Sequence, residues 1–120
     1  MFKLVLVVEN DPMLRHATTM MFEDAGLHVE DFAGADEALL FTSANSARIA
    51  AVFTDVQMPG VIDGSTLAKT IAAQWPHIVV VVNSGQTDRP QDFPDSVRFI
   101  LKPWRYDDVL PIMQDASDPL

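Results

Sequence analysis

Five short apolar runs recur along the chain, and most are separated by stretches with a helical pattern. The runs cover residues 4–8, 27–32, 49–54, 78–82 and 97–101. Nearly continuous runs of valine, leucine, isoleucine and alanine, such as 4–8 and 49–54, are typical of strands buried on both faces of a sheet. Residues 27–32 instead alternate apolar with polar side chains, which predicts a strand nearer an edge.

The stretches between the runs carry helix signals. Asp11 begins the first helix and Gly26 ends it. The expected helices cover residues 12–25, 35–43, 65–74 and 106–115. Met13, Met20 and Met21 recur at helical spacing in the first of them, and we interpret this methionine stripe as core.

Prolines limit the remaining helices. Pro90 and Pro94 lie between the fourth and fifth runs, where a proline removes backbone donors and clashes in a helix interior. We therefore expect a loop or a single turn over residues 86–95. Pro111 lies inside the last helix and should shorten or bend it.

Strands that alternate with helices imply right-handed crossovers and a central parallel sheet. The predicted fold is α/β, a doubly wound five-stranded parallel sheet in which the fourth helix is short or missing. A chain of 120 residues has no room for a second core, so residues 1–120 are expected to form one domain. In such sheets, ligands bind beyond the carboxyl ends of the strands, where the strand order reverses.

Composition excludes several classes of function. The net charge of −9 disfavours direct nucleic-acid binding, because phosphate backbones would repel the chain. There are no cysteines for disulfides or thiolate chemistry. The first apolar run is too short for a signal segment or a membrane span, so a cytoplasmic location is expected.

Three strand ends carry residues suited to one site. Glu9 follows the first run and Asp55 the third, so the two carboxylates should lie close together and need a cation. Mg²⁺ is the expected ion, because it prefers oxygen ligands and neutralises phosphoryl charge. Lys102 follows the fifth run and supplies a mobile positive charge. Asp55 is then a candidate nucleophile for a phosphoryl group.

Five motifs extend this pattern over nearly the whole chain. They are Val7-Val8-Glu9-Asn10-Asp11-Pro12, Thr54-Asp55-Val56-Gln57-Met58-Pro59-Gly60, Asp63-Gly64, Asn83-Ser84-Gly85 and Lys102-Pro103. In order and spacing the chain resembles the receiver domain of two-component response regulators, which has a flavodoxin-like fold. The resemblance implies that Asp55 is the phosphoacceptor and that the backbone carbonyl of Gln57 is a metal ligand. It also implies that Lys102 contacts the phosphoryl group, that the peptide bond to Pro103 is cis, and that Phe99 is the aromatic switch residue.

Two positions depart from the family pattern. Asn10 stands where a second acid usually binds the metal, so the implied ligands are Glu9, Asn10, Asp55 and Gln57, with a weaker hold on Mg²⁺. Asn83 stands where a threonine or serine hydroxyl usually bonds the phosphoryl group. Its amide could donate instead, and Ser84 is a further possible donor.

The leading hypothesis is a signalling module that takes a phosphoryl group from a histidine kinase or phosphotransfer protein and then alters its binding to partners. It would not be an enzyme acting on an external substrate. The alternative is a degenerate receiver that binds partners without phosphorylation. A dehalogenase-type phosphatase or a flavin carrier is disfavoured, because Gln57 replaces the phosphatase's second aspartate and the acidic first loop would repel a flavin phosphate.

The chain ends soon after the last predicted helix, so we expect either a stand-alone receiver or one domain of a longer protein. The family often dimerises through the fourth helix, and its replacement by residues 86–95 means that this dimer is not expected here.

Overall fold

The computed structural model describes residues 3–56, 58, 60–85 and 92–118. Its strands are β1 (Leu4–Val8), β2 (His28–Phe32), β3 (Ile49–Asp55), β4 (Val79–Ser84) and β5 (Arg98–Leu101). Its helices are α1 (Pro12–Asp24), α2 (Ala35–Asn45), the short 3₁₀ helix η1 (Ser46–Arg48), α3 (Gly64–Gln74) and α4 (Tyr106–Ser117).

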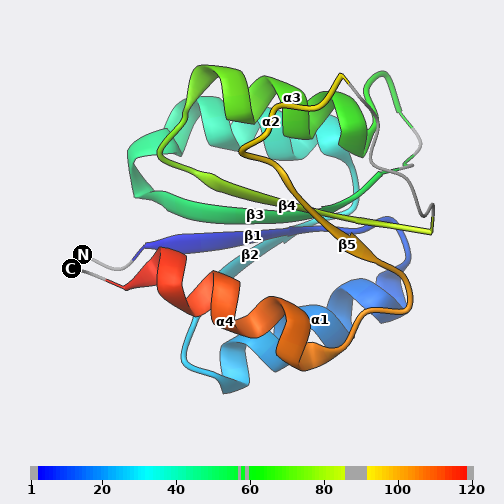
Figure 1. Ribbon diagram of the computed structural model, residues 1–120, viewed down its shortest axis with the longest axis vertical. Coiled ribbons are helices and arrows are strands. Elements are labelled where there is room, and N and C mark those ends of the chain that lie inside the picture. The colour runs from blue at the N-terminus through cyan, green and yellow to red at the C-terminus, as the bar shows by residue number, and fades with distance from the viewer. Residues whose placement is uncertain (1–2, 57, 59, 86–91, 119–120) are drawn as a thin grey trace.

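The strands form one parallel sheet in the order β2-β1-β3-β4-β5. Helices α2 and α3 cover one face, and α1 and α4 cover the other (Figure 1). This confirms the predicted doubly wound α/β fold, with β2 at an edge. The strand order reverses between β1 and β3, so a ligand crevice is expected beyond their carboxyl ends.

The core has two layers, because side chains of a strand alternate between the two faces of a sheet. On β1, Leu4, Leu6 and Val8 pack into the layer beneath α2 and α3. Val5 and Val7 pack into the opposite layer, with residues of α1 and α4. Burial of both faces explains the unbroken apolar run.

The interpretation of the methionine stripe as core is wrong for two of its members. Met13 is 81% exposed and Met20 is 47% exposed, whereas the buried residues of α1 are Thr18 and Phe22. At about 100° per residue, Met13 and Met20 fall on the side of the helix opposite to that pair. The helix faces the sheet through the side that carries Thr18 and Phe22, so Met13 and Met20 remain at the surface, while Met21 is half-buried.

The proline predictions have mixed outcomes. Helix α4 is not shortened by Pro111, and it extends to Ser117. Pro111 is exposed, and the carbonyl it leaves without a helical partner belongs to the exposed Asp107, where water can replace the bond. Between β4 and β5, residues 92–97 form turns and bends without a helix, and the remainder of that segment lies outside the described residues. No helix among the described residues is long and apolar enough to cross a membrane.

Candidate phosphoacceptor site

Asp55 is the last residue of β3, and its carboxylate is held at both oxygens. Oδ1 accepts a hydrogen bond of 2.8 Å from the backbone N–H of Val56. Oδ2 lies 2.9 Å from the ammonium of Lys102, and the Asp55 side chain is only 15% exposed. The carboxylate is therefore oriented and paired with a positive charge at the mouth of the predicted crevice.

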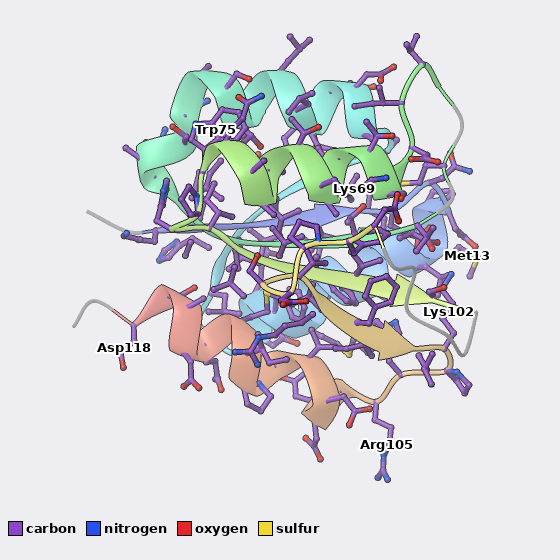
Figure 2. All side chains as sticks on the ribbon, turned by 45° about the horizontal axis from the view of Figure 1, so that its top comes forward. Met13, Lys69, Trp75, Lys102, Arg105 and Asp118 are labelled. Atoms are coloured by element: carbon purple, nitrogen blue, oxygen red, sulfur yellow. The ribbon has the colours of Figure 1, made fainter. Side chains whose placement is uncertain are left out.

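Lys102 reaches this position from the end of β5. Its backbone N–H donates to the carbonyl of Ser84 at 2.8 Å, which continues the β4–β5 pairing by one residue. The following peptide bond, Lys102-Pro103, is cis, as the resemblance implied. Figure 2 shows Lys102 at the same end of the molecule as Met13. The structure thus brings together Asp55 and Lys102, which the sequence separates by 47 positions.

Glu9 lies half-buried directly after β1. Burial raises the pKa of its carboxyl, and the negative charges of Asp55 and Asp11 act in the same direction. The backbone N–H of Asp11, which donates to Oε2 at 3.0 Å, and the charge of Lys102 oppose this rise. Crowded carboxylates of this kind favour a nearby cation.

The remaining residues near the predicted metal site are Asn10 and Asp11, which follow Glu9, and Gln57, which follows Asp55 by two positions. Asp11 caps α1, since its Oδ1 accepts from the backbone N–H of Met13 at 2.9 Å and of Leu14 at 3.4 Å. It is thereby committed to the helix start rather than to the crevice. Asn10 is exposed, and Gln57 lies outside the described residues.

The donor set fits a hard cation only in part. The two carboxylates of Glu9 and Asp55 provide charge and oxygen, while Asn10 can add only a neutral carbonyl. Within the part of the chain that the structure describes, no group of three histidine, aspartate or glutamate side chains is arranged to hold a metal ion. A cation here would need backbone oxygens or water to complete its coordination.

Asn83 lies opposite Asp55 in the β3–β4 register and is 4% exposed. Its Nδ2 donates to the carbonyl of Thr54 at 3.3 Å, whereas its buried Oδ1 has no hydrogen-bond partner among the described residues. Ser84 is also buried, but as the next residue of the strand it faces the opposite side of the sheet. Of the two predicted donors, Asn83 is the better placed toward Asp55.

Phe99 is half-buried on β5. Its ring packs edge-on against Phe93, with centroids 4.9 Å apart and an interplanar angle of 87°. Phe93 belongs to the core layer beneath α2 and α3, and the ammonium of Lys69 lies 5.5 Å from its ring centroid. The predicted switch residue is thus packed against Phe93, in the described part of the segment between β4 and β5.

Sequence reasoning missed two supports of this site. Arg15 donates from Nη1 to the carbonyl of Glu9 at 2.9 Å and pairs with Asp31 at 3.7 Å, which ties α1 to the ends of β1 and β2. Gly64 packs so closely on the backbone of Asp55 that a Cβ would overlap its carbonyl oxygen. The Asp63-Gly64 pair was a visible signal for Gly64, but no local pattern marks Arg15.

A cavity of about 590 Å³ adjoins the site between α1 and the segment after β5. Its lining is mostly apolar, with polar groups near the crevice. The lining residues are Val7, Val8, Glu9, Leu14, Ala17, Thr18, Met21, Phe53, Asn83, Lys102, Pro103, Trp104 and Tyr106. Trp104 is half-buried, with its ring edge-on to Phe53 at 5.1 Å, so it packs on the core and also borders the cavity.

Comparison with known proteins supplies the family context. The family model for the response regulator receiver domain matches residues 5–113. The C4-dicarboxylate transport transcriptional regulatory protein DctD of Rhizobium meliloti (strain 1021) is 35% identical over 118 residues, which cover 95% of this chain and 25% of DctD. The chain therefore spans about a quarter of the length of that relative.

Two solved structures share the fold. A response regulator receiver domain protein from Clostridium thermocellum superposes with a TM-score of 0.84 at 21% identity, covering 95% of this chain and 93% of that one. The response regulator protein TrrA from Thermotoga maritima, in complex with Mg(2+)-BeF, has a TM-score of 0.79 at 21% identity, covering 95% and 98%. At these identities the likeness concerns the fold alone.

Proposed function

Because the chain belongs to the response regulator receiver domain family, we propose that Asp55 accepts a phosphoryl group from a histidine kinase or phosphotransfer protein. Receivers are modules of two-component signalling and not a family of enzymes acting on external substrates. In this proposal residues 1–120 act as one receiver domain, and phosphorylation changes its binding to partners. The observation that carries the proposal is the 2.9 Å contact between the Lys102 ammonium and the Asp55 carboxylate.

The chemistry assigned to Asp55 is a displacement at phosphorus. One carboxylate oxygen forms a new P–O bond while the bond between phosphorus and the donor's imidazole nitrogen breaks, and the leaving imidazole takes a proton from water. Val56 and Lys102 orient the carboxylate for this attack. Lys102 also attracts the incoming phosphoryl oxygens as a point charge.

Mg²⁺ is the proposed cofactor. Glu9 and Asp55 would hold it through their carboxylates, with Asn10 and the backbone of Gln57 as further oxygen donors. When bound, the ion neutralises negative charge on the phosphoryl group. The raised pKa of Glu9 supports this, because burial and the charge of Asp55 both disfavour an uncompensated carboxylate there.

Exposed apolar residues beside the crevice support docking of the phosphodonor. Met13 is 81% exposed and Leu14 52% exposed on α1, and Leu14 lines the cavity together with Trp104 and Tyr106. An amphipathic helix that carries the donor histidine could lay its apolar face in such a groove.

The net charge of −9 disfavours nucleic acid as a direct partner. A cytoplasmic location without membrane attachment is part of the proposal.

Acetyl phosphate provides a partner-free test of the proposal. After incubation with Mg²⁺, intact-protein mass spectrometry should detect the addition of one phosphoryl group to the wild type. The Asp55→Asn variant keeps the shape of the side chain but removes the nucleophilic carboxylate, so it should show no addition.

A second candidate function is a degenerate receiver that binds partners regardless of phosphorylation. Asn83 favours it, because an amide replaces the usual hydroxyl and its Nδ2 already donates to the Thr54 carbonyl. Phosphorylation could then occur at Asp55 without moving Phe99. Beryllofluoride with Mg²⁺ separates the two functions: backbone NMR shifts that reach Phe99 support a working switch, and shifts confined to the Asp55 crevice support the degenerate module.

A further inference from the structure

Asp36, in the first turn of α2, holds the loop that leads from Asp55 to α3. The backbone N–H of Val61 donates to its Oδ2 at 3.1 Å, and the N–H of Ile62 donates to its Oδ1 at 3.0 Å. A Cβ on Gly60 would lie 3.2 Å from the same Oδ2, so the carboxylate also packs closely on the loop backbone. One side chain thus binds two consecutive amides that lie 25 and 26 residues away in sequence.

This bidentate contact stabilises the exposed Val61 and adds to the packing of Ile62, which is partly buried against the core layer beneath α2 and α3. The side chain of Val61 is 93% exposed, so it contributes almost no burial. Nearer the phosphoacceptor, the loop is fixed by Val56, whose carbonyl accepts from the backbone N–H of Ser65 at 3.2 Å and whose N–H donates to Asp55. Asp36 therefore provides the hydrogen-bonded anchor of the end of the loop that lies farther from the nucleophile, beside the packing of Ile62.

We propose that Asp36 is a positioning residue for the phosphoacceptor: by clamping Val61 and Ile62, it limits the movement of the loop and thereby keeps the Val56 N–H on the Asp55 carboxylate. Its importance for phosphorylation rests on the proposed function. Its effect on the loop and on Val56 does not depend on a metal ion or a phosphodonor.

Amide hydrogen exchange tests the proposal on the metal-free protein. In Asp36→Ala, exchange at Val61 and Ile62 should accelerate about ten-fold or more, because each loses a charge-assisted bond. Exchange at Val56 should accelerate as well. Glu37→Ala is the matched control, since it removes a neighbouring first-turn acid of α2 and leaves all three amides unchanged. Acceleration confined to Val61 and Ile62, with Val56 at the wild-type rate, would overturn the proposal.

A Mg²⁺ titration followed by backbone NMR gives the functional readout. Asp36→Ala should raise the Mg²⁺ concentration at half-saturation by about ten-fold, as expected when a residue that supports a metal ligand is lost. Asp36→Asn retains one acceptor oxygen and should give a smaller shift. An equal shift in both variants would indicate an effect of charge alone and would contradict positioning. If the wild type shows no response to Mg²⁺, the proposed function fails, while the exchange rates still decide the role of Asp36.

Discussion

The ammonium of Lys102 lies 2.9 Å from Oδ2 of Asp55. Asp55 ends β3 and Lys102 follows β5, and these two strands are not neighbours, because β4 lies between them in the sheet. This contact joins the two strand ends that supply the nucleophile and the positive charge. It also neutralises a carboxylate that is only 15% exposed. Removing either partner should therefore affect chemistry more than stability, because ion pairs of partly exposed side chains contribute at most about 1 kcal/mol.

Lys102→Ala should slow phosphorylation by acetyl phosphate about 100-fold, the scale of losing one charge-stabilising donor. Lys102→Arg should restore little of this rate, because a planar guanidinium does not reproduce a compact ammonium. Lys3→Ala is the control, since Lys3 is exposed at the opposite end of β1. Rates measured by intact mass against time check the prediction, and a wild-type rate in Lys102→Ala would contradict it.

Glu9→Gln should make stability less dependent on pH. Burial raises the pKa of Glu9 in the folded state, so the folded protein binds the proton more tightly than the unfolded chain. Wild-type stability should therefore fall, relative to the variant, as the pH rises from the ordinary glutamate value through the raised pKa. Melting temperatures without divalent ions should favour Glu9→Gln at neutral pH and converge with the wild type below about pH 4.

With Mg²⁺ at neutral pH, the wild type should instead have the higher melting temperature, since it keeps the second carboxylate that the ion needs. Glu23→Gln on the exposed part of α1 is the control and should leave the response of the melting temperature to Mg²⁺ unchanged. If the difference in melting temperature between Glu9→Gln and the wild type stays constant across pH, the charge of Glu9 does not cause that difference.

Gly64→Ala should destabilise the protein by about 1–3 kcal/mol, because the added Cβ overlaps the carbonyl oxygen of Asp55 and forces α3 away from β3. Gly85→Ala is the control, since no described atom lies within 4 Å of a Cβ there. Urea unfolding checks the difference. Equal midpoints for the two variants would mean that the α3 start tolerates a side chain at this position.

Asn83→Thr should leave stability unchanged or increase it by about 1 kcal/mol. The substitution removes a buried Oδ1 that has no partner in the described part of the chain, which offsets the loss of the 3.3 Å bond to Thr54. Because threonine supplies a hydroxyl, the response of Phe99 to beryllofluoride should also increase. Unfolding free energies and NMR shifts measure the two effects, and a large loss of stability would show that the amide is required for packing.

Much of the site could be predicted from the residues that follow the apolar runs. Parallel strands place their carboxyl ends at one edge of the sheet, so Glu9, Asp55 and Lys102 were expected to converge. The structure brings Asp55 and Lys102 into contact, and Glu9 lies near enough for both charges to act on its carboxyl. The strand ranges were also close to those observed, since runs buried on both faces leave a clear pattern.

Other features depend on tertiary contacts that local patterns do not contain. Periodicity identified α1 as a helix but not which of its sides faces the sheet, and the buried side includes Thr18 while Met13 is exposed. Asp36 looks like an ordinary first-turn acid of α2 until the fold brings the amides of Val61 and Ile62 to it. Pro111 was expected to interrupt α4, but its exposed position lets the helix continue.

Locating the phosphoryl group tests directly whether Asp55 is the phosphoacceptor. After phosphorylation with acetyl phosphate and Mg²⁺, borohydride reduces an aspartyl phosphate to homoserine, and peptide mass mapping identifies the modified position. We predict modification at residue 55 in the wild type and none in Asp55→Asn. Modification that persists in Asp55→Asn, or its absence from the wild type at saturating Mg²⁺, would contradict the assignment of Asp55 as the phosphoacceptor.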